Sequence, residues 1–406
     1  SNVSIVDLGQ IPENAPNVFP GISGATTEQK QALAGMIVWN TYDYLEPNGD
    51  GLYVWDGNKW NYTGGSDGYA LCVTVPAPEC LPAMPTVTFM VYNLGADAAK
   101  LNADYLGLSP AKQQMAYLAT HAFNKLDACV YGGLFQWGRP DLEHAVKRPD
   151  YLRYDGTDNA VAGQSSTIPT DGEFFYGSTN WYTGTNPAQD ALWGNGEAIN
   201  TVTADGVYSL NSYYYQKSVE TQYDPCPDGW RVPTQDEFER LSNYGCGAPQ
   251  TAGGNINTTV SGHATIQSGL TWIPVVCDNS SGKCVPSNSW TVNITSSGYA
   301  IYEASVWTAA KGTGGVYSGL TNDNVPTIFA SKSLHDDDAP EPLLFLPAAG
   351  HRYCYDGVVT GVGTTGFYWS STINSYALYI ISNTVQTTYA NPDIAHGFSV
   401  RCVKSL

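Results

Sequence analysis

The sequence predicts an α+β fold for most of the chain, because two helical stretches are combined with one run of strands. Residues 109–128 (SPAKQQMAYLATHAFNKLDA) and residues 234–241 (TQDEFERL) each begin with a helix-capping signal. Residues 342–403 contain stretches rich in β-branched and aromatic residues, and turn residues separate them. Helices and strands that occupy separate parts of the chain are typical of α+β domains.

The first predicted helix has Ser109 as its cap and Pro110 in its first turn, where the missing N–H of proline costs no hydrogen bond. Its apolar residues recur at helical spacing, so one face of the helix is expected to be buried. The residues on that face are Met115, Leu118, Ala122, Phe123 and Leu126.

The second predicted helix belongs to PCPDGWRVPTQDEFERL (225–241), the stretch with the densest structural signals in the chain. Thr234 and Glu237 fit a capping box, in which each side chain binds the backbone N–H of the other residue. Arg231 is expected to bind a neighbouring carboxylate or carbonyl group. The residues of the predicted turn and of the apolar helix face are Asp228, Gly229, Phe238 and Leu241.

Composition divides the chain into three parts. Residues 1–30 are rich in Pro, Asn and Gly and are expected to be a linker or stalk. Residues 31–85 are expected to form a small β-hairpin unit, with three short strands between residues 35 and 62. Residues 86–406 are expected to form the α+β domain, with long insertions that are low in charge and rich in Gly, Ser and Thr.

The composition also excludes several partners. The chain has 37 acidic residues against 18 Lys and Arg, which gives a formal net charge of −19. Nucleic acids and anionic membranes select for basic patches, so neither is expected to bind. No apolar run approaches the roughly 20 residues of a membrane-spanning helix, so direct membrane insertion is not expected. The 28 tyrosines suit a binding surface or, alternatively, reflect the β-propensity of Tyr in an extracellular protein.

Nine cysteines predict disulfides and an oxidising, extracellular environment. Cys72 and Cys80 enclose one short segment, and Cys277 and Cys284 enclose another. Both segments are filled with turn residues, so each pair is expected to close a loop. The odd total leaves one thiol free, or buried as a small apolar side chain. The sequence starts without a signal peptide, so export implies that a leader has been removed.

Six short motifs occur in order along the large domain. They are YNLGAD (92–97), LFQWGR (134–139), CPDGWRVPTQDEFERL (226–241), LPAAGHR (346–352), YWSST (368–372) and GFSVRCV (397–403). Together they resemble the Fibrobacter succinogenes major paralogous domain, a module of surface proteins in the Bacteroidetes and their relatives. The resemblance covers residues 86–405 apart from long insertions, and the hairpin unit resembles one that often precedes such domains.

This resemblance implies a fold similar to C-type lectin-like domains and to formylglycine-generating enzymes. It also implies an exported protein of the cell surface, outer membrane or pilus, commonly a cell-adhesion or fimbrial component. Cys226 and Cys402 lie in adjoining family motifs and are expected to form a disulfide. The tryptophans of the motifs are expected in the core and are Trp137, Trp230 and Trp369.

The segment between the last two motifs is expected to bind the ligand. Apolar residues at 377, 378 and 380 are expected to hold a strand in place, while polar and tyrosine side chains point outward. Some lectin-like proteins diversify such a segment; the alternative is an ordinary exposed hairpin. The candidate ligand-binding residues include two tyrosines that follow the LPAAGHR motif. They are Tyr353, Tyr355, Asn374, Ser375, Tyr376, Tyr379, Asn383, Tyr389, Asn391 and Asp393.

Catalytic and metal motifs give little support for an enzyme. The segment GGSDG (64–68) matches the nucleophile pattern G-x-S-x-G, but no helix follows it, as a nucleophile elbow requires. Formylglycine-generating enzymes have a cysteine pair where this chain has only Cys354, and the histidines show no metal-ligand spacing. No cofactor is therefore expected. The alternative to a solvated loop at HDDDAPE (335–341) is a calcium site formed by Asp336, Asp337 and Asp338.

We therefore expect a non-enzymatic adhesin at the cell surface or at a pilus tip. Its expected partner is a host or bacterial surface protein or glycan, with other pilus subunits as further partners. The sequence ends directly after the last motif, which suits a terminal position in a pilus. The alternatives are a structural module of the envelope, a phage receptor-binding protein of the same fold and a secreted enzyme.

Overall fold

The computed structural model divides the chain into two compact units, residues 1–72 and residues 73–406. The residues that the structure describes are 37–40, 51–55, 60–64, 72–75, 87–146, 159–169, 172–193, 220–227, 229–242, 264–265, 270–287, 295–303, 333–372, 377–381, 384–389 and 392–405. Each unit is considered by itself.

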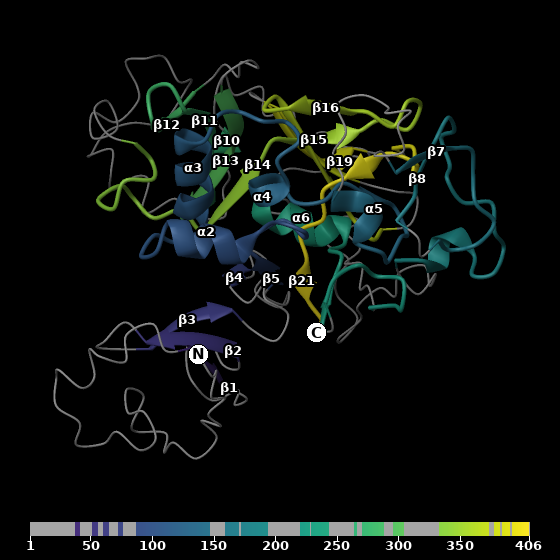
Figure 1. Cartoon of the computed structure of the whole chain (residues 1–406), viewed down its shortest axis with the longest axis horizontal. Helices are drawn as coiled ribbons and strands as arrows, with labels where there is room; N and C mark the ends of the chain where they lie inside the picture. Colours follow the sequence, from purple (N-terminus) through teal and green to yellow (C-terminus); the bar gives the residue numbers. More distant parts are fainter. Residues whose placement is uncertain are drawn as a thin grey trace, which may run out of the picture. The chain divides into compact units, whose positions relative to one another are not determined.

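The first unit contains an antiparallel sheet of three short strands in the order β1-β2-β3 (Figure 1). These strands are β1 (Ile37–Asn40), β2 (Gly51–Trp55) and β3 (Trp60–Gly64). They lie where the sequence predicts the strands of the β-hairpin unit.

The second unit mixes helices with a larger share of strands, as the α+β prediction requires. None of the described helices has the length and apolar character that a membrane crossing needs. The helices are α2 (Ala98–Asp104), α3 (Pro110–Thr120), α4 (Ala128–Tyr131), α5 (Glu143–Val146), the 3-10 helix η1 (Gln189–Ala191) and α6 (Gln235–Ser242).

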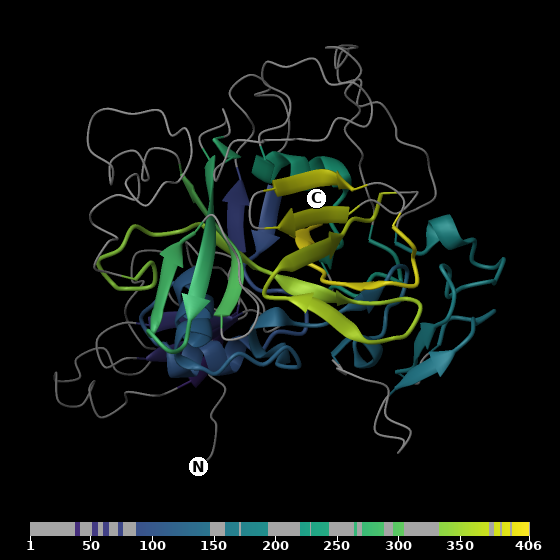
Figure 2. The same cartoon turned by 90° about the horizontal axis from the view of Figure 1, so that it is seen from above.

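Two large sheets dominate the second unit (Figure 2). A five-stranded sheet has the order β10-β11-β13-β14, with β12 paired to β11. A seven-stranded sheet has the order β19-β18-β17-β15-β20-β6, with β16 paired to β15. The strands of the first are β10 (Ala264–Thr265), β11 (Leu270–Asp278), β12 (Lys283–Pro286), β13 (Thr295–Glu303) and β14 (Leu344–Pro347). The strands of the second are β6 (Phe135–Gln136), β15 (Ala349–Arg352), β16 (Val359–Val362), β17 (Thr365–Trp369), β18 (Ala377–Ile381), β19 (Thr384–Tyr389) and β20 (Gly397–Phe398).

Two smaller sheets complete the second unit. A four-stranded sheet has the order β4-β5-β21-β9, so β4 joins the second unit although the sequence assigns it to the hairpin unit. A parallel pair consists of β7 and β8. The strands are β4 (Cys72–Val75), β5 (Val87–Met90), β9 (Trp230–Arg231), β21 (Val403–Lys404), β7 (Ala160–Ala162) and β8 (Phe174–Tyr176).

The helix predicted at 109–128 is too long, because α3 covers only its first part and α4 begins at its last residue. Met115 and Leu118 of the predicted apolar face are buried in α3, whereas Ala122, Phe123 and Leu126 lie beyond its end. Ser109 caps α3 as expected, but α3 ends at Thr120, because His121 adopts an extended conformation and stacks on Tyr117 at 3.8 Å. Asp127 then caps α4. Residues 111–119 of α3 are all buried, since the helix packs against α2 and against the five-stranded sheet (Figure 1). Residues on all faces of α3 are therefore buried, including those outside the predicted apolar face.

The predictions for the stretch 225–241 are confirmed. Thr234 N–H donates to Glu237 Oε2 at 2.8 Å, and Glu237 N–H donates to Thr234 Oγ1 at 3.3 Å, which is the capping box. Arg231 binds the same carboxylate through two hydrogen bonds of 2.7 and 2.5 Å. Phe238 and Leu241 are buried on the apolar face of α6. Asp228 lies outside the described residues, and Gly229 has the positive φ of a turn.

Core and disulfide predictions are confirmed where the structure describes them. The three motif tryptophans, Trp137, Trp230 and Trp369, are buried. Disulfides join Cys226 to Cys402 and Cys277 to Cys284. The side chains of Cys72 and Cys80 lie outside the described part of the chain. Cys129 and Cys354 are not disulfide-bonded.

The Arg231–Glu237 ion pair is almost inaccessible, with exposed side-chain fractions of 1% and 2%. We predict that Glu237→Gln lowers the free energy of unfolding by about 3–5 kcal/mol, because it removes the carboxylate that the buried guanidinium binds through two hydrogen bonds. Glutamine can still form the capping box, so the loss of stability measures the effect of removing the negative charge. The double variant R231M/E237L should recover most of the stability in guanidinium unfolding. A double variant less stable than E237Q would contradict this account.

The two disulfides close loops of very different length, 176 and 7 residues. Loop-closure entropy predicts a loss of about 5 kcal/mol for the longer loop and about 2 kcal/mol for the shorter. We therefore predict that C226A/C402A is less stable than C277A/C284A in chemical unfolding. Equal losses of stability would show that the entropy of the denatured chain does not depend on loop length in the way assumed here.

Candidate functional site

The Tyr353–Gly357 turn joins β15 to β16 and carries two of the predicted ligand-binding tyrosines. Backbone hydrogen bonds from Tyr353 N–H to Val358 O at 2.9 Å and from Gly357 N–H to Tyr353 O at 2.8 Å close the turn. The exposed fractions are 37% for Tyr353 and 49% for Tyr355, and their ring centroids lie 5.2 Å apart. Two aromatic faces are therefore presented side by side to solvent.

Arg352 holds this turn from inside the protein. Its side chain is fully buried, and its Nε donates to the carbonyl oxygen of Gly357 at 2.6 Å. Its Nη1 donates to Asn159 Oδ1 at 2.7 Å, while the guanidinium lies over the ring of Phe174 at 3.9 Å. Because a buried guanidinium needs partners for its donors, the turn is fixed to the sheet below it.

Cys354, at the centre of the turn, points inward. Its thiol is buried and lies 3.6 Å from His396 Nε2 and 3.8 Å from Asp393 Oδ2. The same His396 Nε2 lies 3.8 Å from Asp393 Oδ2. Among the described residues, these are the three His, Cys, Asp or Glu side chains whose ligand atoms all lie within 4.8 Å of one another. We call them the Cys354 cluster.

The loop that brings Asp393 and His396 to this cluster is held by Gln136 of β6. Gln136 is fully buried, and its Nε2 donates to the carbonyl oxygens of Ala395 and Phe175, both at 2.8 Å. His396 N–H donates to Asp393 O at 2.9 Å, which makes a tight turn just before β20. Pairing of Arg352 in β15 with Gly397 in β20 then sets the turn and the loop side by side.

A second polar group supports Gln136. His144 Nε2 accepts a hydrogen bond from Gln136 N–H at 3.0 Å, and its Nδ1 lies 2.6 Å from the carbonyl oxygen of Asp141. Arg139 binds the Asp141 carboxylate through two hydrogen bonds of 2.8 Å. Burial and the nearby Arg139 lower the pKa of His144 to about 4, so its imidazole is neutral and can accept from the backbone.

Burial shifts the pKa of both the Cys354 thiol and the His396 imidazole toward the uncharged form. Burial, together with the charge of Asp393, raises the pKa of the Cys354 thiol to about 12. Burial lowers the pKa of His396, although Asp393 and the carbonyl of Arg352 act in the opposite direction. A reactive cysteine needs a lowered pKa, so this arrangement does not provide a thiolate nucleophile.

Aromatic rings connect the exposed tyrosines to the seven-stranded sheet. Tyr353 lies 5.3 Å from His396, which stacks on Phe398 at 5.4 Å. Phe398 stacks on Phe367 at 4.7 Å, and Phe367 lies 4.6 Å from Tyr379. This aromatic row crosses from β18 through β17 and β20 to the turn. It gives the exposed pair a packed and therefore rigid base.

The structure brings three of the predicted ligand-binding residues together, namely Tyr353, Tyr355 and Asp393. Tyr379 is half-buried within the aromatic row. The apolar strand residues Ala377, Leu378 and Ile380 are buried as predicted. The remaining predicted residues lie outside the described side chains and are Asn374, Ser375, Tyr376, Asn383, Tyr389 and Asn391.

Sequence reasoning missed His396 and the inward-facing role of Cys354. Helical metal spacing does not detect this pair, because Cys354 and His396 are 42 residues apart in sequence. Two weak signals were present, the Asp-x-x-His spacing of 393–396 and a cysteine flanked by tyrosines. Neither shows that β15 and β20 are neighbours.

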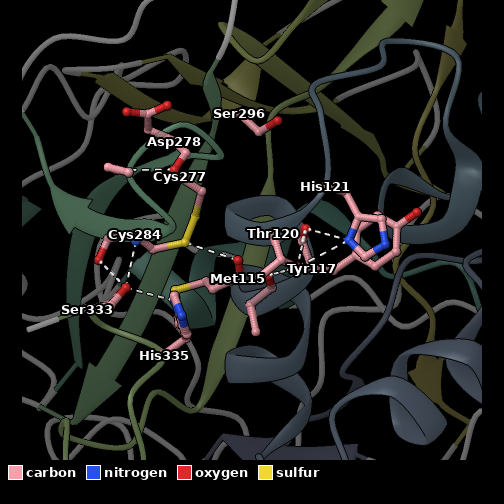
Figure 3. Close-up of a disulfide and its surroundings, with 12 residues drawn as sticks. Met115, Tyr117, Thr120, His121, Cys277, Asp278, Cys284, Ser296, Ser333 and His335 are labelled. Carbon is pink, nitrogen blue, oxygen red and sulfur yellow. Dashed lines mark hydrogen bonds between the residues drawn. A yellow bond between two sulfur atoms is a disulfide. The ribbon is translucent and has the colours of Figure 1, made fainter.

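A second polar region surrounds the Cys277–Cys284 disulfide beside α3 (Figure 3). The Sγ of Cys284 lies 3.1 Å from the carbonyl oxygen of Met115, and Ser333 Oγ accepts from Cys284 N–H at 2.6 Å. On the other side of α3, Tyr117 donates to Asp127 at 2.7 Å and stacks on His121. These polar groups are paired with one another, which is typical of a structural role.

The carboxylates of the predicted calcium loop do not converge. Asp336 Oδ2 accepts from Ser333 N–H at 2.9 Å, and Asp337 and Asp338 are exposed. The buried Lys112 ammonium donates to the carbonyl oxygen of Ala339 at 2.9 Å and lies 3.1 Å from the carboxylate of Glu341. An ammonium group therefore already binds the carbonyl side of this loop.

Comparisons with family models, with curated proteins and with solved structures find no match to this chain. The resemblance carried by the sequence motifs therefore stays a prediction. The site has to be interpreted from its own chemistry.

The neutral state of His144 predicts a pH dependence of stability. In the unfolded chain an imidazole takes up a proton near pH 6.5, whereas folded His144 does so only near pH 4. The contribution of His144 is therefore fully present above pH 6.5 and is lost as the pH falls to about 4, by up to about 3 kcal/mol.

We predict that His144→Gln, which keeps an acceptor for Gln136 N–H, is less stable than the wild type at pH 7. The gap between the two proteins should narrow between pH 6.5 and pH 4 in guanidinium unfolding. The comparison removes the effects of titrating groups that do not contact His144, since both proteins contain them; Asp141 is the contacting group. A constant gap would contradict the assigned protonation state.

Proposed function

We propose that this protein is a non-enzymatic surface adhesin that binds a glycan or a protein through the exposed tyrosine pair and its surroundings. The observation that carries the proposal is the pairing of Tyr353 and Tyr355, with exposed fractions of 37% and 49%, above a packed aromatic row. Among the side chains that the structure describes, the other exposed large hydrophobic ones are Leu106 and Leu142.

The chemistry of the pair suits a neutral or weakly polar ligand. Tyrosine offers contact area with a polar tip and loses little conformational entropy on binding. Asp393 lies next to Tyr355, since its negative charge raises the pKa of the Tyr355 hydroxyl. Its carboxylate can accept hydrogen bonds from sugar hydroxyls or peptide N–H groups. The net charge of −19 disfavours polyanions.

A rigid base favours binding because less freedom is lost when the ligand arrives. The turn is closed by backbone hydrogen bonds and held by the buried Arg352. The side chain of Cys354 is buried beneath the turn, which supports a binding role for the exposed tyrosines over nucleophilic catalysis by this thiol.

The proposal also includes export to the cell surface and a C-type lectin-like fold. The two disulfides suit an oxidising environment, and we place the protein on the cell surface or on a pilus. The mixed helix-and-sheet unit is compatible with the C-type lectin-like fold that the sequence motifs imply. Other pilus subunits are proposed as further partners.

We predict that Y353A/Y355A weakens binding to the natural ligand by about ten- to a hundredfold, because aromatic residues at the centre of an interface contribute most of its binding energy. Ligands would be found with a glycan array and with intact host and bacterial cells, and affinities would be measured by biolayer interferometry. Leu106→Ala is the matched control, since Leu106 is 76% exposed and lies far from the pair in sequence.

The alternatives give different outcomes in the same assays. A structural module of the envelope would bind neither glycans nor cells but would copurify with envelope proteins. A phage receptor-binding protein would bind bacterial cells only. A ligand that binds equally well to the wild type and to Y353A/Y355A would overturn the proposed site while leaving an adhesin role possible elsewhere on the protein.

A further inference from the structure

The Cys354 cluster has the dimensions of a metal site. Its three ligand atoms form a triangle with edges of 3.6 Å between Cys354 Sγ and His396 Nε2, and 3.8 Å from Asp393 Oδ2 to each of the other two. Zinc bonds of about 2.3 Å to sulfur and about 2.0–2.2 Å to nitrogen and oxygen give a tetrahedral face with edges of about 3.3–3.6 Å. The observed triangle is within a few tenths of an ångström of that face.

We propose that Cys354, Asp393 and His396 bind a divalent transition-metal ion of the zinc class. One thiolate, one imidazole and one carboxylate are ligands that Zn²⁺ accepts together, whereas Ca²⁺ and Mg²⁺ require oxygen ligands. The proposal concerns the ion alone and does not depend on the adhesin role.

Three protein ligands leave one position of a tetrahedral ion open. The cluster is closed on the Cys354 side, where the thiol is fully buried, and more accessible on the Asp393 side, where 34% of the side chain is exposed. Solvent or a ligand therefore approaches the ion most easily from the side of Asp393, next to Tyr355. A water molecule or an oxygen of a bound ligand can fill it.

The hydrogen bonds of His396 show what has to change when the ion binds. Its Nδ1 lies 3.2 Å from Cys354 N–H, and accepting that hydrogen bond leaves the ring proton on Nε2. An ion at Nε2 needs the proton on Nδ1. Binding of the ion at Nε2 therefore replaces the hydrogen bond that Nδ1 accepts from Cys354 N–H by one that Nδ1–H donates, and the backbone of Arg352 also hydrogen-bonds this ring.

Ion binding also requires the thiolate form of Cys354. The sulfur–hydrogen bond breaks, the sulfur–metal bond forms with the electron pair left on sulfur, and the proton goes to solvent. No oxidant or reductant is involved. The ligand atoms need little movement, because Cys354 is fixed by the turn and His396 by the loop that Gln136 holds.

The test uses the full chain, stripped of metal with a chelator and then dialysed against Zn²⁺ or Co²⁺. We expect one additional ion per chain in the wild type relative to the variants C354S and H396Q, measured by elemental analysis. The Co²⁺ form should show a thiolate-to-cobalt charge-transfer band, and excess Ca²⁺ should not displace the ion. Cys129→Ser is the matched control, since Cys129 is a free cysteine outside the cluster.

The affinity for Zn²⁺ should fall at least about tenfold in C354S and in H396Q and should stay unchanged in C129S. Near-ultraviolet circular dichroism checks that each variant is folded. A folded wild type whose Co²⁺ spectrum lacks the charge-transfer band overturns the proposal. So does a band that survives in folded C354S, because another cysteine would then be the ligand.

Discussion

The C-terminal segment, residues 392–405, is the part of the chain on which the rest of the second unit depends. Its strand β20 pairs with β15 and β6, and its strand β21 pairs with β5 and β9. Between these strands, the carbonyl oxygens of Val400 and Cys402 accept hydrogen bonds of 2.9 Å from Leu94 and Met90. Buried backbone groups need hydrogen-bond partners. This one segment provides such partners to the seven-stranded sheet and to the four-stranded sheet. The disulfide to Cys226 fixes its position.

Buried arginines fix further parts of the second unit through their hydrogen bonds. Arg231 binds a carboxylate on α6, whereas Arg401 donates to backbone carbonyls of Met90 and Phe345 and has its pKa lowered to about 10 by burial. Arg352 binds the carbonyl of Gly357. A chain with few charged residues thus places several cations in its interior, where each one requires a defined set of acceptors. At Arg352 this requirement also shapes the proposed binding surface.

The exposed tyrosine pair and the Cys354 cluster are the two faces of one turn. Tyr353 and Tyr355 on either side of Cys354 are exposed to solvent, while the side chain of Cys354 is buried. The pairing of β15 with β20 brings Asp393 and His396 to that inward side. The proposed ligand-binding tyrosines and the proposed metal ligands would therefore depend on the same rigid turn. Different variants test the two proposals.

The sequence by itself determined what depends on neighbours along the chain or on the motif resemblance. The capping box of Thr234 and Glu237, the Cys277–Cys284 pair and the α+β class follow from spacing and residue type, whereas the burial of the motif tryptophans follows from what the resemblance implies. Only the tertiary structure decided the rest. The first helix ends at Thr120, because His121 adopts an extended conformation, and its burial on every side replaces the expected amphipathic pattern. The Cys354 cluster consists of residues about forty positions apart that the pairing of β15 with β20 brings together. Local spacing in the sequence does not predict which strands become neighbours.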